Sequence, residues 1–165
     1  MENIFRTTKC FGVDGQAKCK GGFPKGFVKW LKEMGWWGKK RVYLCSGAIN
    51  DESAITVDIR PEVNPTLVED ARKTSIKSDS CDLVIIDPPY TKELSKELYG
   101  TEKYYGGINA FANEASRICQ PGGKIITLSY EIPKRVKDSE FIAVCGIYTI
   151  PFTGYMRCLT VSVKK

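Results

Sequence analysis

A short apolar run that stops at two prolines is the feature that most constrains the fold of this chain. Residues 83–86 read LVII, a continuous apolar stretch typical of a central strand in a parallel sheet that is covered on both faces. Pro88 and Pro89 end the strand, because proline cannot donate to the strand ladder and disfavours a helix before it. Asp87 is therefore predicted at the carboxyl end of this strand, where open α/β sheets bind ligands.

Two further strands are predicted upstream, and both end in residues suited to a ligand site. Residues 41–47 (RVYLCSG) read as a strand that runs into a small-residue turn, made by Cys45, Ser46 and Gly47. Residues 55–60 (ITVDIR) read as a β-branched strand with Asp58 at its carboxyl end, where an acid binds ribose hydroxyls in nucleotide-binding folds. A plain turn and a solvated aspartate are the alternatives. The strand-end aspartate about thirty residues later favours the ligand interpretation.

The four residues after the LVII strand carry the chemistry, and they are Asp87, Pro88, Pro89 and Tyr90. This tetrapeptide resembles the catalytic motif of the S-adenosylmethionine-dependent amino-methyltransferases, which methylate exocyclic nitrogens of adenine or cytosine in DNA. The resemblance implies that the Asp87 carboxylate and the Pro88 carbonyl accept hydrogen bonds from the amine, and that Pro89 stiffens the turn. It also implies that Tyr90 stacks on a base swung out of the duplex. A strand that merely stops at a Pro-Pro turn is the alternative.

The same resemblance places the cofactor, S-adenosylmethionine, against residues upstream of this motif. The turn from Cys45 to Gly47 and the carboxylate of Asp58 would contact it, and Ile59 would pack on the adenine face. Asp70 and Ala71 match an Asp-Ala pair that faces the adenine amino group in many such enzymes. A helix start is the alternative for Asp70, which could cap residues 71–75.

An amphipathic helix is predicted over residues 23–34, because apolar side chains recur there at intervals of three and four. Many amino-methyltransferases have a helix at this place whose start contacts the methionine end of the cofactor. The resemblance therefore suggests Phe23 and Lys25 as neighbours of that carboxylate. A helix that simply covers the sheet is the favoured alternative.

The remaining chain completes one α/β core. A helix is predicted over residues 108–119, a strand over 124–130 and a terminal antiparallel hairpin over 141–150 and 156–163. We expect the Rossmann-like fold of the class I methyltransferases, a seven-stranded, mostly parallel sheet with an antiparallel C-terminal hairpin. The connection over residues 46–54 is too short for a crossover helix, which usually needs about a dozen residues or more. The first crossover is therefore expected to be a bare loop.

Length and composition predict a single cytoplasmic domain. The 165 residues suffice for one methyltransferase domain, with residues 1–22 as a basic extension and residues 23–165 as the core. No apolar run reaches membrane length, and the amino terminus lacks the apolar segment of a signal peptide. Seven scattered cysteines are typical of a reducing compartment, and a chain without histidine is not expected to bind a metal.

Charge and length also bear on the partner. Residues 1–41 contain ten Lys or Arg against three acidic residues, whereas the rest of the chain is nearly balanced. This excess favours nucleic acid as a partner, although a solvated lysine face is the alternative. The resemblance to DNA amino-methyltransferases favours DNA over RNA. The chain after Tyr90 leaves no room for a separate target-recognition region, and residues 91–107, polar and rich in tyrosine, are expected to form a substrate-side lip. A protein partner or a structured target would then supply recognition.

Two other functions remain open from the sequence. Certain ribosomal RNA methyltransferases that act on guanine N2 carry a similar Asp-Pro-Pro-aromatic run, so an RNA base, guanine N2 or adenine N6, is the alternative substrate. A non-catalytic cofactor-binding subunit of a larger partner is the other alternative. Protein glutamine methyltransferases more often have Asn at the first motif position, so Asp87 argues against them.

Overall fold

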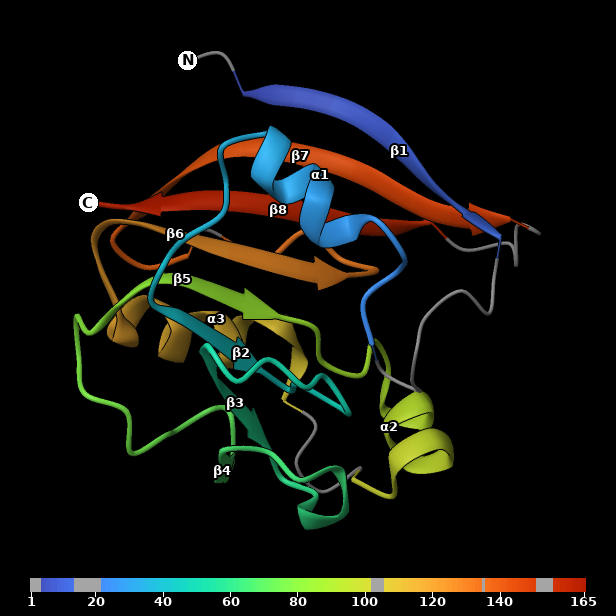
Figure 1. Ribbon diagram of the computed structural model, residues 1–165, viewed down its shortest axis with the longest axis vertical. Helices are drawn as coiled ribbons and strands as arrows, with labels where there is room; N and C mark the ends of the chain where they lie inside the picture. Colours follow the sequence, from blue (N-terminus) through green and yellow to red (C-terminus); the bar gives the residue numbers. More distant parts are fainter. Residues whose placement is uncertain (1–3, 14–21, 102–105, 135, 151–155) are drawn as a thin grey trace.

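The computed structural model describes residues 4–13, 22–101, 106–134, 136–150 and 156–165, and they build one eight-stranded sheet (Figure 1). The order of the strands across the sheet is β1-β7-β8-β6-β5-β2-β3-β4. The strands are β1 (Phe5–Val13), β2 (Arg41–Leu44), β3 (Ala54–Asp58), β4 (Leu67–Val68), β5 (Cys81–Ile86), β6 (Cys119–Ser129), β7 (Ser139–Ile150) and β8 (Arg157–Lys164). The helices are α1 (Phe27–Glu33), α2 (Lys92–Tyr99) and α3 (Gly107–Ile118), with a 3₁₀ turn at Pro61–Val63.

The sheet has the mostly parallel pattern that the sequence predicts. Strands β4, β3, β2, β5 and β6 are parallel neighbours, and β8 pairs antiparallel with both β6 and β7. The LVII run lies in β5, at the centre of the sheet. Its residues alternate between the two faces, with Leu83 and Ile85 on the α1 side and Val84 and Ile86 on the α3 side, all at most 1% exposed. The predicted doubly covered central strand is confirmed.

The amino-terminal segment differs from the prediction. Residues 1–22 are expected as an extension outside the core, but Phe5–Val13 forms strand β1, which pairs parallel with β7 and raises the number of strands from seven to eight. Phe11 of this strand is buried, and its ring lies 5.6 Å from that of Phe27 and 5.5 Å from that of Trp30. Through these aromatic contacts the strand packs against helix α1. The sequence alone does not indicate them, because the segment is basic and reads as an extension outside the core.

Each face of the sheet is covered by one of the described helices. Helix α1 packs on one face and α3 on the other, and the described connection between β2 and β3 contains no helix, as the short spacing predicts (Figure 1). Helix α1 begins at Phe27 rather than at residue 23, because Gly26 before it adopts a left-handed backbone with φ 85°. Within the described residues, no helix is long and apolar enough to cross a membrane.

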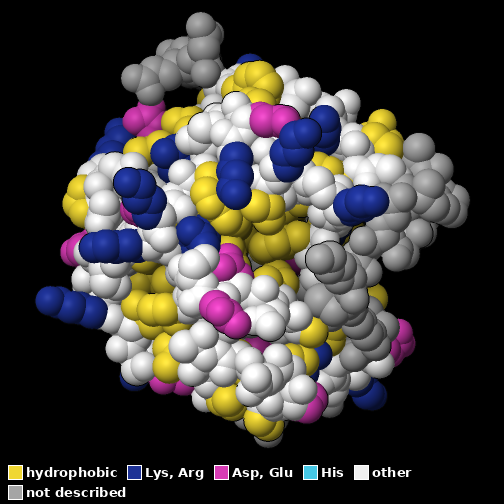
Figure 2. Space-filling model, in the orientation of Figure 1, with side chains coloured by type: hydrophobic (Ala, Val, Ile, Leu, Met, Phe, Trp, Pro, Cys, Tyr) yellow, Lys and Arg dark blue, Asp and Glu magenta, His cyan; other side chains and the backbone are white. Residues whose placement is uncertain are grey.

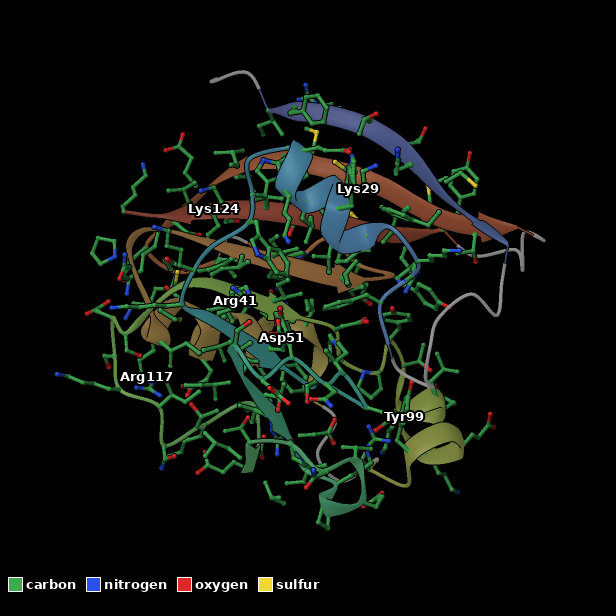
Figure 3. The ribbon with its side chains drawn as sticks, in the orientation of Figure 1. Lys29, Arg41, Asp51, Tyr99, Arg117 and Lys124 are labelled. Atoms are coloured by element: carbon green, nitrogen blue, oxygen red, sulfur yellow. The ribbon has the colours of Figure 1, made fainter. Side chains whose placement is uncertain are left out.

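A polar network of Arg41, Tyr43 and Asp51 lies where a crossover helix would otherwise cover β2. The Tyr43 hydroxyl donates to Asp51 Oδ2 at 2.7 Å, and the Arg41 guanidinium forms an ion pair with the same carboxylate at 3.1 Å. Figure 3 shows Arg41 and Asp51 close together at this end of the sheet. The guanidinium also lies 4.8 Å from the ring centre of Trp37. The loop between β2 and β3 is thereby fixed by charge and hydrogen bonds instead of by a packed helix.

Candidate active site

A cavity of about 330 Å³ opens at the carboxyl ends of the parallel strands. Parallel strands bring their carboxyl ends to one edge, so residues that follow β2, β3, β4 and β5 meet there although they are far apart in sequence. Ten of the residues predicted for the site line this cavity: Cys45, Gly47, Asp58, Ile59, Asp70, Ala71, Asp87, Pro88, Pro89 and Tyr90.

Three predicted residues do not line the cavity. Ser46 is buried beneath the turn, where its backbone N–H donates to the Val57 carbonyl at 3.0 Å. Phe23 lines a second cavity on the α1 face instead. The centre of its ring lies 4.9 Å from the ring centre of Phe27 and 5.7 Å from that of Tyr43. Lys25 is exposed ahead of α1. The predicted contacts of Phe23 and Lys25 with the methionine end of the cofactor therefore find no support in their positions.

The Asp87 carboxylate lines the cavity and is held by its own motif. The backbone N–H of Asp87 donates to the Leu44 carbonyl at 3.3 Å, which continues the pairing of β5 with β2. The Tyr90 hydroxyl donates to Asp87 Oδ1 at 2.8 Å. Burial raises the pKa of Asp87 above its usual value, while the charge of Arg157 and the hydrogen bond from Tyr90 act in the opposite direction.

The cavity wall also contains Tyr130 and Arg157, which are not foreseen from the sequence. Tyr130, which follows β6, places its ring centre 4.5 Å from that of Tyr90 at an interplanar angle of 42°. Arg157, the first residue of β8, directs Nη1 to the Tyr90 hydroxyl at 3.4 Å. The position of Tyr130 after an apolar strand is a usable signal. Arg157 follows Tyr90 by 67 positions, and no local pattern marks it.

A hydrogen bond joins the turn after β2 to the end of β3. Cys45 and Gly47 both have left-handed backbone, with φ of 59° and 55°, which folds the chain tightly at the cavity wall. The Gly47 N–H donates to Asp58 Oδ2 at 2.9 Å. The Asp58 carboxylate is 5% exposed and also accepts from the Arg60 side chain, with Nε to Oδ1 at 3.0 Å and Nη2 to Oδ2 at 3.1 Å. Asp58 thus has the predicted strand-end position, with Arg60 as its partner.

Arg60 also connects this carboxylate with the α2 side of the cavity. Its guanidinium lies 4.7 Å from the ring centre of Tyr99, the last residue of α2. Helix α2 falls inside the stretch expected as a substrate-side lip, and it is capped by Thr91, whose hydroxyl accepts from the Leu94 N–H at 3.1 Å. The α2 side of the cavity wall consists of Leu94, Ser95, Tyr99 and Thr101. Tyr104 and Tyr105 of the same stretch lie outside the described residues.

Asp70 lies in a turn after β4 rather than at the start of a helix. Its Oδ1 accepts from the Arg72 backbone N–H at 2.9 Å and from Arg72 Nε at 2.9 Å, and these hydrogen bonds lower the pKa of Asp70. Ala71 beside it is buried. The helix-cap alternative is therefore excluded, and the carboxylate lines the cavity with a guanidinium as its neighbour.

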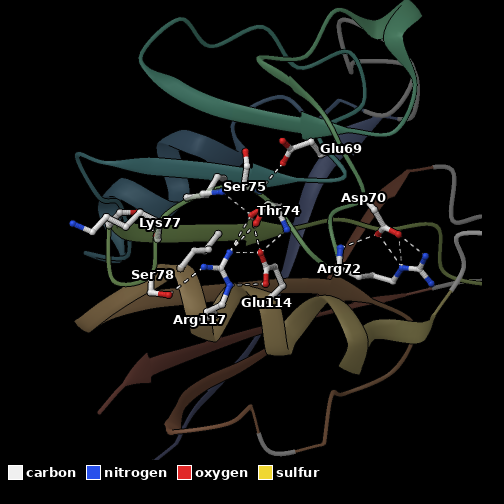
Figure 4. A network of polar contacts seen from close by, with 12 residues as sticks. Glu69, Asp70, Arg72, Thr74, Ser75, Lys77, Ser78, Glu114 and Arg117 are labelled. Atoms are coloured by element: carbon white, nitrogen blue, oxygen red, sulfur yellow. Dashed lines mark hydrogen bonds and ion pairs between the residues drawn. The ribbon is translucent and has the colours of Figure 1, made fainter.

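A buried polar network anchors the loop that carries Asp70 (Figure 4). Glu114 of α3 is 6% exposed, and its Oε1 accepts from the Thr74 N–H and from the Thr74 hydroxyl, both at 2.7 Å. Arg117, one turn later, donates from Nε to Glu114 Oε2 at 2.9 Å and from Nη2 to the Thr74 carbonyl at 3.1 Å. The position of this loop thus depends on a helix whose residues come about forty positions later.

The site combines three carboxylates, those of Asp58, Asp70 and Asp87, with aromatic rings and arginine side chains. Among the described residues, no group of three or more Cys, Asp or Glu side chains is arranged to hold a metal ion. The carboxylates of Asp58 and Asp70 have guanidinium partners, whereas the Asp87 carboxylate accepts a hydrogen bond from a hydroxyl. Such a cavity is chemically suited to a ligand with hydroxyl and amine donors that reaches the Asp87 carboxylate.

Comparisons with solved structures identify the fold. The chain resembles the N-methyltransferase NodS from Bradyrhizobium japonicum, with 8% sequence identity and a TM-score of 0.56, over 83% of this chain and 92% of that one. It also resembles a Burkholderia thailandensis 1,6-didemethyltoxoflavin N1-methyltransferase, solved with S-adenosylhomocysteine bound, with 8% identity and a TM-score of 0.54, over 84% and 76% of the two chains.

A third similar structure is a chain of the complex that contains the Haloferax volcanii Trm112 methyltransferase activator, with 12% identity and a TM-score of 0.54, over 84% of this chain and 94% of that one. No family model matches the sequence, and no curated protein matches it. At such low identity these likenesses establish architecture. The protein has the Rossmann-like fold of the S-adenosylmethionine-dependent methyltransferases, with an additional parallel strand at one edge.

Proposed function

We propose that this protein transfers a methyl group from S-adenosylmethionine to an exocyclic amine of a nucleic acid base, with adenine N6 in DNA as the leading target. The observation that carries the proposal is the position of Asp87 and Pro88 in the strand-end cavity, next to the aromatic rings of Tyr90 and Tyr130. A carboxylate and a carbonyl are acceptors for both hydrogens of an amine, and aromatic rings can stack on a base.

The cofactor would occupy the part of the cavity bordered by β2, β3 and β4. Asp58 would accept from ribose hydroxyls, Asp70 from the adenine amino group, and Ile59 would pack on the adenine face. The small-residue turn places Cys45 and Gly47 on the cavity wall next to the Asp58 carboxylate, which supports the fit. When bound, S-adenosylmethionine supplies an electrophilic methyl group.

In the reaction, Asp87 and the Pro88 carbonyl orient the amine and withdraw its hydrogens from the plane of the base. The nitrogen lone pair is thereby uncoupled from the aromatic ring and becomes able to attack. The ionised Asp87 would stabilise the positive charge that develops on the nitrogen as the nitrogen–methyl bond forms and the methyl–sulfur bond breaks. S-adenosylhomocysteine would be the leaving group, and one amine hydrogen would leave as a proton to Asp87 or to water. Pro89 limits the freedom of the turn, so these acceptors are held before the substrate arrives.

Nucleic acid as the partner is supported by the surface around α1. Figure 2 shows Lys and Arg side chains gathered over and beside this helix. The exposed lysines of this part of the chain are Lys25, Lys29, Lys32, Lys39 and Lys40. Lys18 and Lys20 lie outside the described residues, and Trp36 belongs to the core, where it is 6% exposed. A duplex or a folded RNA would meet this surface through its phosphates.

The decisive experiment combines a binding and a transfer assay. The variant Asp87→Ala is expected to bind S-adenosylmethionine with unchanged affinity and to transfer no labelled methyl to DNA or RNA. The matched control Glu52→Ala removes an exposed carboxylate outside the cavity and should retain full transfer. Mass spectrometry of the product nucleosides then identifies the methylated base and distinguishes adenine N6 from the RNA alternative, guanine N2. Undiminished transfer by Asp87→Ala would refute the mechanism.

The same assay addresses a protein partner. All strands and helices of the described chain belong to the sheet, its covering helices or the cavity wall, which supports a recognition surface supplied by a second protein or by the shape of the target. A chain that binds the cofactor and transfers methyl groups only after a partner is added would be a subunit of a larger enzyme. Transfer by the purified chain alone would exclude that requirement.

A further inference from the structure

We propose that Arg157 determines substrate specificity by donating a hydrogen bond to the ring nitrogen beside the acceptor amine. The site then selects bases whose Watson–Crick edge places the amine beside an unprotonated ring nitrogen, as in adenine and cytosine, and disfavours guanine bound by that edge. This inference rests on the proposed function, and it adds a residue and a selection rule to it.

The environment of Arg157 differs from that of the other partly buried arginines. Four arginines form ion pairs with a carboxylate: Arg41 with Asp51, Arg60 with Asp58, Arg72 with Asp70 and Arg117 with Glu114. Among the described residues, no carboxylate lies within 4 Å of the Arg157 side-chain nitrogens, although Arg157 lines the cavity and is partly withdrawn from solvent. Its hydrogen bond within the described chain is the long one to the Tyr90 hydroxyl, at 3.4 Å.

A guanidinium has five N–H donors, and a partly buried one is costly to leave without acceptors. Arg157 therefore retains donor capacity toward whatever fills the cavity. Since Arg157 begins β8 while Asp87 follows β5, the sheet itself fixes the separation between them, with β6 in between. This rigid placement is what a specificity residue requires.

Asp87 and Arg157 present an acceptor and a donor on either side of the Tyr90 hydroxyl. Tyr90 donates to Asp87 Oδ1 and receives Nη1 of Arg157, so the three groups form one chain of hydrogen bonds along the cavity wall. The other carboxylate oxygen, Oδ2, has no hydrogen bond from the described residues and remains for the acceptor amine. An acceptor followed by a donor is the complement of an amine N–H followed by a ring nitrogen.

The bases differ in this pattern. Adenine offers the N6 amine beside the N1 acceptor, and cytosine offers the N4 amine beside the N3 acceptor. On its Watson–Crick edge guanine offers the N2 amine beside an N1–H, which would face the guanidinium of Arg157; its N3 acceptor lies on the other side of the amine, next to the sugar. A site built to pair with one edge rejects an edge that leaves its buried polar groups unpaired, and this discrimination reaches several orders of magnitude in favourable cases.

The test removes the acceptor from the substrate and the donor from the protein, separately and together. Oligonucleotides carrying adenine or 1-deazaadenine, in which C–H replaces N1, are methylated by the wild-type protein and by Arg157→Met. The wild-type protein should prefer adenine by roughly tenfold to a hundredfold in kcat/KM, the range expected for a hydrogen bond to a charged donor. In Arg157→Met the two substrates should react at similar rates, because the donor is gone.

A preference for adenine that is equally large in Arg157→Met would overturn the inference and leave the proposed function intact. Absence of transfer to any base by the wild-type protein would overturn the proposed function as well. Lys124→Met, at the opposite end of the sheet from Tyr99 in Figure 3, is the matched control and should keep the wild-type preference. Should Arg157→Met fail to fold, Arg157→Lys is the second variant, because it retains the charge but loses the planar fork of donors. Its preference for adenine over 1-deazaadenine should fall by at least about threefold. An unchanged preference would count against the inference.

Discussion

The Tyr90 hydroxyl donates a 2.8 Å hydrogen bond to Oδ1 of Asp87, three positions earlier in the same motif. The bond engages Oδ1 of a carboxylate that lines the cavity, while Oδ2 accepts no hydrogen bond from the described residues. The Tyr90 hydroxyl thus holds the acid, in addition to the stacking on a base that we propose for its ring. The two prolines between these residues restrict the turn that makes the contact.

The pH dependence of transfer should report this bond. In the proposed mechanism transfer requires the ionised Asp87, so the rate should fall as the pH drops through the raised pKa of this group. Because the hydrogen bond from Tyr90 lowers that pKa, Tyr90→Phe removes a lowering influence, and the acid limb of the rate profile should move to higher pH. Stopped assays of labelled methyl transfer at a series of pH values measure the shift. An acid limb that stays in place would show that Tyr90 does not set the charge of Asp87.

Cofactor affinity should depend on Asp58. Asp58→Ala removes the proposed ribose acceptor and also frees Arg60 and the Gly47 N–H, which both bind the carboxylate. We expect the dissociation constant for S-adenosylmethionine to rise about tenfold or more, the effect of losing a hydrogen bond that involves a charged group. Isothermal titration calorimetry measures it, with the exposed Glu52→Ala as control. Equal affinities of the two variants would remove Asp58 from the cofactor site.

Stability at acid pH should depend on Asp51. Partial burial raises the pKa of Asp51, but hydrogen bonds from Ser53, Tyr43 and Arg41 outweigh it and lower the pKa to about 2. The carboxylate therefore stabilises the folded state above its ordinary pKa of 3.8, and this contribution is lost as the pH falls toward 2. In Asp51→Asn, the free energy of unfolding should be lower at pH 6 and should decrease less between pH 6 and pH 3.

Urea denaturation at the two pH values measures the difference between Asp51→Asn and the wild-type protein. Glu52→Gln is the neighbouring control and should follow the wild-type pH dependence, because this exposed carboxylate forms no ion pair within the described residues. The same decrease in the free energy of unfolding between pH 6 and pH 3 for Asp51→Asn and the wild-type protein would show that ionisation of Asp51 does not stabilise the folded state.

The network around Glu114 should stabilise the loop that carries Asp70. Glu114→Gln replaces a buried carboxylate that accepts from Thr74 and Arg117, and we expect a loss of about 1–3 kcal/mol in the free energy of unfolding. Glu33→Gln breaks an exposed ion pair with Lys29 and should change the stability by less than about 0.5 kcal/mol. Chemical denaturation compares the two variants. Similar losses would show that burial of Glu114 adds nothing to its interactions.

Much of the fold could be predicted because its signals are local. The LVII run, the prolines after it and the alternating residues of the terminal hairpin depend on chain chemistry over fewer than a dozen positions. The placement of Asp58 and Asp87 at one edge follows from parallel pairing, whereas the placement of Asp70 rests on the resemblance to methyltransferases. Strand β1 was missed because its partner β7 is more than a hundred residues away and its charge favours a solvated segment.

The amino-acid sequence determined the central strand, the acidic residue at its end and the absence of a crossover helix after β2, since each follows from local residue types and spacing. Only the tertiary structure brought Arg157 to Tyr90, because that approach depends on the register of β8 against β6 and β7. Only the tertiary structure shows, likewise, that Phe23 packs against Phe27 and Tyr43 beside α1 rather than lining the cavity. Long-range side-chain contacts of this kind depend on how the sheet and its covering helices pack together, so the local sequence does not predict them.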